Sequence, residues 1–230
     1  GGGAGPLEDG RYWAGVYAVD ARGLRGMPSE ARVLEVGKGS EAAGRTLGEL
    51  KSTQAVPLLK ELIARVSKQE LRAVVSALET IASPGSVEVL YQSLRSSDGH
   101  TRKIAARALV SLAGPAAVQS LFDALHAEVY RDVMEEITDV LATIPSEAVK
   151  KGLCALLANE KEALREMGAR GLGSIGDEES LRFLIKASSD PSPAVRKAVY
   201  KSMARLGIPN AVDEVVKGLN DPDDEVKLSV

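Results

Sequence analysis

The sequence contains two histidines and one cysteine, the side chains best suited to metal or nucleophilic chemistry. Neither His100 nor His126 belongs to a His-Glu pair or to a His-x-x-His spacing that would bind a metal. Cys154 has no histidine near it in sequence and lies among leucines, which favour a neutral, inert thiol. No phosphate-binding loop or nucleophile elbow is present either. We therefore expect no metal, no cofactor and no enzymatic activity.

A repeat of about 31 residues determines the elements that carry these side chains. A leucine, or in the last unit a methionine, recurs at intervals of 31, 31, 32, 31 and 31 residues. The series comprises Leu47, Leu78, Leu109, Leu141, Leu172 and Met203. A second apolar residue follows three positions later in each unit, which is typical of one face of a helix. Repeats of this length are helix pairs that bury their apolar faces by stacking on their neighbours. The sequence predicts about six helix pairs over residues 38–230, followed by the start of a seventh.

The last two units carry a family resemblance. The string DPSPAVRKAVYKSMARLGIPNAVDEVVKGLNDPDDEVK resembles the HEAT repeats of the short PBS-lyase HEAT-like type, and residues from about 40 to 230 follow the pattern. The fourth unit departs from it, because Met134 replaces the arginine and Pro145 the usual glycine. The resemblance implies an all-α fold, an α-α superhelix whose second helices line a concave surface. Members of this class are mostly binding scaffolds, and its di-iron hydroxylases carry His-Glu pairs that this sequence lacks.

Charged residues recur at the turns between units and predict a structural ladder. A basic residue lies seven positions before a repeat leucine or methionine, and the series comprises Arg102, Arg165, Arg196 and, in the seventh unit, Lys227. Asp190 and Asp221 lie in the turns, and each is followed by a proline. We expect these aspartates to cap the next helix. An aspartate beside the arginine or lysine of that helix would form charge-assisted hydrogen bonds along the stack.

Residues 1–37 lie outside the repeat and predict a β-hairpin. Period-two alternation over residues 11–20 and 30–36 indicates two antiparallel strands. The strings VYAVD and MPSEARVLEV resemble the last two strands of a bacterial fibronectin type III domain, with Tyr12 or Trp13 near its tyrosine corner. That resemblance implies the remnant of a larger domain and favours the cell surface or periplasm, with the cytoplasm as the alternative. A hairpin that caps the first helix pair is the other interpretation, and we expect a fragment of a longer protein.

The second helices are predicted to present a row of charges on the concave face. Positions one and five residues after the buried residue that opens each second helix lie one turn apart, off the packed stripe. The acidic-to-neutral half comprises Glu61, Glu88, Gln92 and Asp123, and the basic half comprises Lys150, Lys151, Arg182, Lys186 and Lys217. Two halves of different sign would orient a protein or peptide partner by electrostatic complementarity. Ordinary surface charge that happened to segregate is the alternative.

Two further clusters are interpreted as structural. A small-residue stripe inside a helix is expected to let adjacent first helices approach closely, and it comprises Gly168, Gly171 and Gly173. No strand precedes it, as a phosphate loop would require. An acidic patch on the convex side is expected to be a solvated helix face, and it comprises Glu135, Glu136 and Asp139.

Composition narrows the classes of function. The net charge of −3 gives no basic footprint, so nucleic acid is not an expected partner. No continuous apolar run reaches the roughly 18 residues of a membrane span, and the initial GGGAG lacks the features of a signal peptide. The expected function is a non-catalytic protein-interaction scaffold that binds a protein or peptide on its concave face. The alternative is a lyase or chaperone-like subunit that acts on a cofactor-bearing protein, as in some phycobilin lyases of this repeat type.

Overall fold

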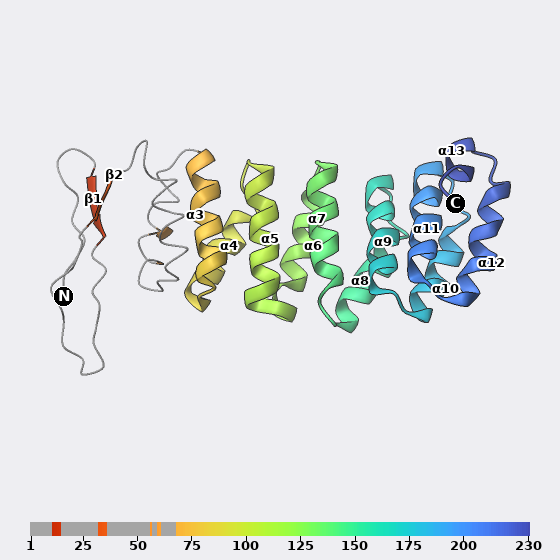
Figure 1. Ribbon diagram of the computed structural model, residues 1–230, viewed down its shortest axis with the longest axis horizontal. Coiled ribbons are helices and arrows are strands. Elements are labelled where there is room, and N and C mark those ends of the chain that lie inside the picture. Colours follow the sequence, from red (N-terminus) through yellow and green to blue (C-terminus); the bar gives the residue numbers. More distant parts are fainter. Residues whose placement is uncertain (1–10, 15–31, 36–55, 57–58, 61–67) are drawn as a thin grey trace. The chain divides into compact units, whose positions relative to one another are not determined.

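The computed structural model describes residues 11–14, 32–35, 56, 59–60 and 68–230 (Figure 1). The chain divides into two compact units, Gly1–Leu112 and Ala113–Val230. In the first unit, β1 (Arg11–Ala14) pairs antiparallel with β2 (Arg32–Glu35), and Trp13 lies opposite Val33. The other residues of the predicted strands lie outside the described residues. The resemblance to a fibronectin type III domain stays a prediction.

The helical part of the first unit comprises α3 (Lys68–Ile81), the 3₁₀ helix η2 (Pro84–Ser86), α4 (Val87–Ser93) and α5 (Gly99–Ala113), whose last residue belongs to the second unit. Residues 56, 59 and 60 are also helical, in the range predicted for the preceding pair. Leu78, Leu90 and Leu109 are fully buried. Leu78 and Leu109, the two members of the 31-residue series described in this unit, therefore lie in the core, as the sequence predicts, and Leu47 lies outside the described residues.

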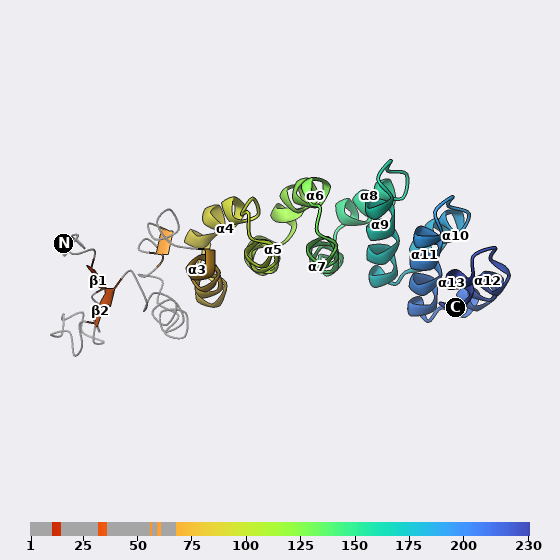
Figure 2. The same ribbon diagram turned by 90° about the horizontal axis from the view of Figure 1, so that it is seen from above.

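The second unit continues the alternation of first and second helices. Its elements are η3 (Gly114–Ala117), α6 (Val118–Ala127), α7 (Arg131–Ala142), α8 (Glu147–Leu156), α9 (Glu162–Ile175), α10 (Glu178–Ala187), α11 (Pro193–Leu206), α12 (Pro209–Lys217), η4 (Gly218–Asn220) and α13 (Asp224–Lys227). Figure 2 shows α7, α9 and α11 in one row and α6, α8 and α10 in another. Leu141 of α7, Leu172 of α9 and Met203 of α11 are all buried, which confirms the predicted register.

Glycines with a left-handed backbone follow three of the first helices. Gly114, Gly176 and Gly207 have φ angles of +50°, +79° and +64°. Glycine adopts this conformation without a Cβ clash, so the chain can reverse direction directly after the helix. The equivalent position after α7 is Pro145, whose ring holds φ near −65°. The departure of the fourth unit from the repeat pattern therefore changes how α7 ends.

The glycines of α9 contact two different helices, which corrects the expectation that all three bring first helices together. A Cβ on Gly168 would lie 2.9 Å from the carbonyl oxygen of Leu153, and one on Gly171 would lie 2.6 Å from the Leu153 side chain. Both positions face α8, the second helix of the preceding pair. Only Gly173 meets the neighbouring first helix, where a Cβ would lie 2.6 Å from the Cβ of Ser202. The approach of α9 to the α8 backbone therefore leaves no room for a Cβ at Gly168, and a Cβ at Gly171 would displace the Leu153 side chain.

One stretch, Gly99–Ala127, is long and apolar enough to cross a membrane by length and composition, with a mean hydropathy of 1.4. It is not one helix, because η3 separates α5 from α6. Core helices of water-soluble folds pass the same test, so the stretch is weak evidence for a membrane span.

Candidate functional site

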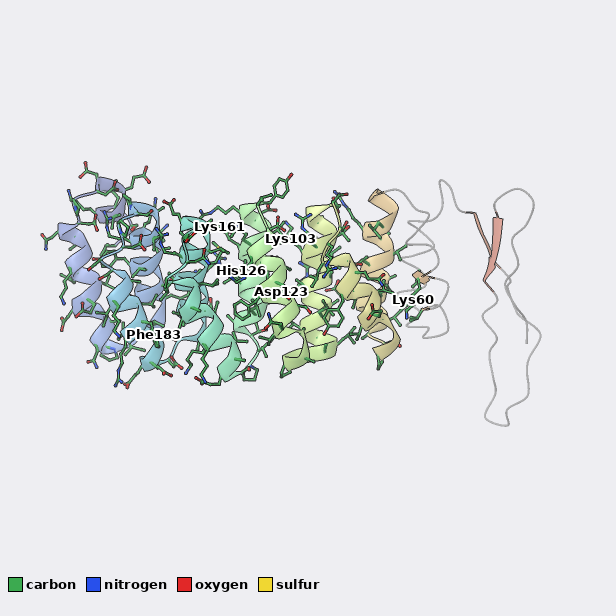
Figure 3. The ribbon with its side chains drawn as sticks, turned by 180° about the vertical axis from the view of Figure 1, so that it is seen from behind. Lys60, Lys103, Asp123, His126, Lys161 and Phe183 are labelled. Carbon is green, nitrogen blue, oxygen red and sulfur yellow. The ribbon has the colours of Figure 1, made fainter. Side chains whose placement is uncertain are left out.

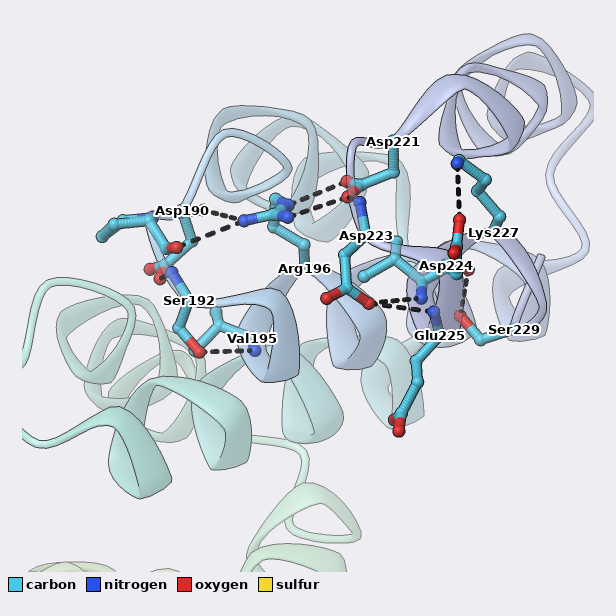
Figure 4. A network of polar contacts seen from close by, with 12 residues as sticks. Asp190, Ser192, Val195, Arg196, Asp221, Asp223, Asp224, Glu225, Lys227 and Ser229 are labelled. Atoms are coloured by element: carbon cyan, nitrogen blue, oxygen red, sulfur yellow. Dashed lines mark hydrogen bonds and ion pairs between the residues drawn. The ribbon is translucent and has the colours of Figure 1, made fainter.

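Arginines of the first helices join consecutive turns. Arg165 of α9 donates to both carboxylate oxygens of Asp190, at 2.8 and 3.1 Å, and to the carbonyl oxygen of Asn159, at 3.0 Å. Arg196 of α11 repeats the arrangement, with two bonds of 2.8 Å to Asp221 and one of 2.9 Å to the carbonyl oxygen of Asp190 (Figure 4). Each arginine therefore binds a carboxylate 25 residues later and the backbone of the turn before its own helix.

The predicted ladder was wrong about which arginine pairs with each aspartate. Asp190 receives its ion pair from Arg165 of the preceding first helix, whereas Arg196 of the next helix contacts its carbonyl oxygen. Nor does Asp190 cap α11. Ser192 caps α11 and Asp223 caps α13, and each accepts a backbone N–H of its helix. The aspartate two residues earlier accepts the N–H of the capping residue instead.

The other predicted members of the ladder have different partners. Lys227 donates to Asp224 of its own short helix, at 2.7 Å, and Arg102 donates to a carbonyl oxygen of the preceding turn, also at 2.7 Å. Sequence reasoning missed a rung in the first unit, where Arg72 binds both carboxylate oxygens of Asp98, at 2.9 and 2.5 Å. Arg72 and Asp98 are 26 residues apart, close to the 25 residues that separate Arg165 from Asp190. This similar spacing could have revealed the pair from the sequence.

Lys150, assigned by sequence to the basic half of the groove, is engaged within the protein. Its Nζ lies 2.7 Å from a carboxylate oxygen of Asp177 and 2.7 Å from one of Glu179, at the start of α10. The hydrogen bonds to Asp177 and Glu179 raise the pKa of Lys150. Partial burial would raise the pKa of Asp177, but hydrogen bonds from Lys150 and Ser180 lower it to about 2. This corrects the assignment, because Lys150 is not a free cation.

Lys151 is the repeat equivalent of Arg182, since α8 and α10 begin 31 residues apart and each side chain belongs to the fifth residue of its helix. Together with Lys186 they form what we call the cationic strip: Lys151, Arg182 and Lys186, all exposed. Within the described part of the chain, none of the three forms an ion pair, although Lys186 Nζ lies 5.9 Å from the ring centroid of Phe183, the residue marked on α10 in Figure 3. Lys217, by contrast, pairs with a glutamate of α12 at 2.7 Å.

The predicted acidic-to-neutral half is described in part. Glu61 lies outside the described residues. Glu88 and Gln92 are exposed on α4 of the first unit and bond to one another at 3.4 Å. Asp123 is exposed on α6 of the second unit and accepts from a glutamine one turn earlier, at 2.9 Å (Figure 3). The division of one groove into two halves of different charge stays a prediction.

Two of the three predicted patch residues on α7, Glu135 and Asp139, are bound to cations, which corrects the expectation of a solvated patch at these positions. Arg170 of α9 donates to both carboxylate oxygens of Asp139, at 2.8 and 2.7 Å. Arg131 donates to Glu135 at 3.1 Å and to Glu166 of α9 at 2.5 Å. The pairs Arg170–Asp139 and Arg131–Glu166 join α7 to α9, whereas Arg131–Glu135 lies within α7. Asp139 therefore serves the contact between the two helices.

Cys154 is half-buried on α8, and burial raises the pKa of its thiol. The thiol is therefore protonated near neutral pH, the state that the sequence led us to expect. Nδ1 of His126 lies 2.8 Å from the carbonyl oxygen of Phe122, within the same helix. Among the described residues, no group of three or more His, Cys, Asp or Glu side chains is placed to hold a metal ion.

The ion pair at the start of α10 predicts a loss of stability in acid. The pKa of Asp177 is about 2 in the folded chain and about 3.9 when unfolded, so its contribution is complete above pH 4 and is lost as the pH falls toward 2. Because the side chain is 40% exposed, we expect about 1 kcal/mol. Asp177→Asn, which can still cap the helix, should lower the free energy of unfolding at pH 7 by this amount and at pH 2 by almost nothing. Equal losses at both pH values in urea titrations would contradict the assignment.

Residues 66–142 and 150–230 match the family model described as HEAT repeats, and residues 41–65 match that of the PBS lyase HEAT-like repeat. Among solved structures, human deoxyhypusine hydroxylase in complex with glycerol is 19% identical, with 83% of this chain and 76% of that chain covered and a TM-score of 0.40. An engineered protein from the Northeast Structural Genomics Consortium is 23% identical, with 82% and 62% covered and a TM-score of 0.43. No curated protein matches the sequence.

Proposed function

This chain belongs to the HEAT-repeat family. We propose that it is a non-catalytic interaction scaffold that binds a protein or peptide partner along its second helices. Stacked helix pairs present one long, regular surface, on which each repeat contributes side chains at the same position. Such a surface suits a partner that lies across several repeats. The cationic strip is the part of it that supports this function best.

The observation that carries the proposal is the contrast between the cationic strip and the cations beside it. Lys150 and Lys217 are held by carboxylates at 2.7 Å, so their charge is already compensated within the protein. Lys151, Arg182 and Lys186 are exposed, and no carboxylate of the described residues pairs with them. Exposed charges of one sign that the fold leaves uncompensated attract a partner of the opposite sign and raise the rate of encounter.

The chemistry of the strip favours an acidic partner segment. Three cations on two neighbouring helices can each meet a carboxylate of a bound peptide, and the guanidinium of Arg182 can bind one with two parallel hydrogen bonds. The ring of Phe183 adds apolar area next to Lys186. Since the net charge of the chain is −3, the molecule as a whole does not attract an acidic partner, and the attraction must come from local groups of uncompensated cations such as this strip.

Charge reversal tests the proposal. The triple variant Lys151→Glu, Arg182→Glu and Lys186→Glu should lose capture of acidic partners in a pull-down, with a thermal midpoint close to that of the wild type, because exposed substitutions change stability by about 0.5 kcal/mol or less each. Binding by the wild type should weaken as salt rises, since the screening length falls below about 10 Å above 0.1 M. The conservative variant Lys151→Arg, Lys186→Arg should retain binding.

Two outcomes would redirect the assignment. Identical partners for the wild type and the triple variant would exclude the cationic strip as the binding surface. A coloured cofactor or a cofactor-bearing protein that co-purifies with the chain would favour the alternative, a lyase or chaperone-like subunit. Absorption spectra of the purified chain and mass spectrometry of captured proteins distinguish these outcomes.

A further inference from the structure

A surface hollow of about 690 Å³ lies on the side of the first helices, away from the cationic strip. Its lining comes from α7, α9, α11 and the start of α13, all within the second unit. Met167 and Ser202 are buried in it, and Ala194 and Ala198 are half-buried beside them. Small side chains on α11 thus leave room over the contact between α9 and α11. The volume lies in the range of ligand-binding clefts.

Most charges around the hollow neutralise one another. Arg131 is paired with Glu166, and Lys197 of α11 is paired with Glu225 of α13 at 3.0 Å. Asp223, which also lines the hollow, accepts backbone N–H groups of α13. The charges of these groups are therefore largely compensated within the protein, so they attract a charged ligand less than an unpaired cation does.

Lys201 and Arg205, one turn apart on α11, are the exception. Both are exposed and line the hollow. Within the described residues Lys201 has no hydrogen bond or ion pair, and the one bond of Arg205 is to the hydroxyl of Ser174, at 3.4 Å. Two cations on one helix face repel each other, and here no acidic side chain of the described residues pairs with either. The hollow therefore has one uncompensated positive end.

The repeat itself explains why this end is uncompensated. Asp139, Arg170 and Lys201 occupy the same repeat position on α7, α9 and α11, separated by 31 residues each. Both carboxylate oxygens of Asp139 accept hydrogen bonds from Arg170, so the charges of these two residues compensate each other between α7 and α9. On α11 the same position adds a second cation with no second carboxylate. Packing between repeats does not account for that lysine.

Ser202 supplies a hydrogen-bond donor in the lining of the hollow. Ser202 is 4% exposed and lines the hollow. In the sequence it lies between Lys201 and Arg205. The hydroxyl has no hydrogen-bond partner within the described part of the chain. The hydroxyl oxygen itself is not fully enclosed, since the buried side-chain oxygens without a partner among the described residues are those of Ser86 and Ser180. The Ser202 hydroxyl can therefore donate to a ligand in the hollow. A carboxylate that sits over Lys201 and Arg205 would supply the acceptor.

We propose that this hollow is a second docking surface, which binds an acidic segment of a partner protein, with its carboxylates at Lys201 and Arg205 and one of them accepting the hydroxyl of Ser202. A nucleic acid backbone fits poorly, because carboxylates such as Glu166 and Glu225 interrupt the lining and would repel its phosphates. The scaffold would then engage acidic segments on both rows of helices. This surface does not depend on the cationic strip for its binding.

The test uses the 230-residue chain and a fluorescein-labelled peptide of alternating glutamate and glycine residues. If both surfaces bind, fluorescence titration gives two peptides per wild-type chain and one for Lys201→Glu, Arg205→Glu. The affinity of the lost site should fall by about tenfold or more, as expected when two attractive charges become repulsive. Ser202→Ala should weaken the same site by about two- to tenfold, the effect of one hydrogen bond. A photoreactive version of the peptide should label α11.

The triple variant of the cationic strip is the matched control, because it removes three cations from the other row of helices. One remaining site in that variant, lost when Lys201→Glu and Arg205→Glu are added, supports the second surface. If Lys201→Glu, Arg205→Glu leaves the number of bound peptides unchanged, the inference is wrong, whatever the strip variant does. Displacement of the peptide by inorganic phosphate at equal concentration would also overturn it, since a simple anion would then suffice. Loss of binding in the strip variant alone would leave the proposed function standing without the second surface.

Discussion

Arg196→Ala is expected to lower the free energy of unfolding by about 3–5 kcal/mol, because it leaves the Asp221 carboxylate buried without its ion pair. Arg196 is 9% exposed and Asp221 is 6% exposed, so water replaces the lost contacts poorly. The same change removes the bond to the carbonyl oxygen of Asp190, so that two turns are released together. Urea titration followed by far-UV circular dichroism measures the loss.

Two variants calibrate this result. Arg182→Ala also removes an arginine from a helix of the second unit, but this arginine is exposed. It should therefore change stability by about 0.5 kcal/mol or less. Arg196→Lys keeps the positive charge but cannot form the parallel pair of bonds to Asp221, so an intermediate loss is expected. If Arg196→Ala costs no more than Arg182→Ala, the bridge between turns does not stabilise the repeat stack.

Leu109→Ala is expected to cost about 2–5 kcal/mol, the range for a leucine removed from a packed core. Leu109 is fully buried on α5 and belongs to the 31-residue series. Truncation removes apolar contacts and leaves a cavity that surrounding helices fill only in part. The midpoint of urea unfolding should fall, with the slope of the transition unchanged if the unfolding reaction stays the same.

Leu228→Ala is the matched control for that substitution. Leu228 is 88% exposed, so the same change of side chain should alter stability by about 0.5 kcal/mol or less. The comparison separates burial from any intrinsic effect of leucine on the chain. A loss at Leu109 as small as that at Leu228 would show that the repeat register does not define the core.

The sequence alone was sufficient for the repeat register and for the buried leucines. An α-helix turns through a fixed angle per residue, so the spacing of apolar residues determines which side of the helix is buried. A repeat of 31 residues then carries the same pattern from one pair to the next. This is why Leu78, Leu109, Leu141 and Leu172 all lie in the core, as predicted.

Charged side chains could not be assigned in the same way. Lys150 and Lys151 are neighbours in sequence, yet only Lys150 reaches the carboxylates of α10. Long side chains can reach several partners, and the distance between helices selects among them. The sequence therefore identified the cations of the second helices but not which of them the protein already uses.

The direction of the arginine ladder and the contacts of the α9 glycines also depended on tertiary structure. Asp190 is close in sequence to Arg196, but packing brings Arg165 to its carboxylate. Gly171 was predicted to face a first helix and instead faces Leu153 of a second helix. Helical periodicity is a local property, and the sequence determines it residue by residue. The choice of partner across 25 residues or more depends on how the helices pack, which only the folded chain decides.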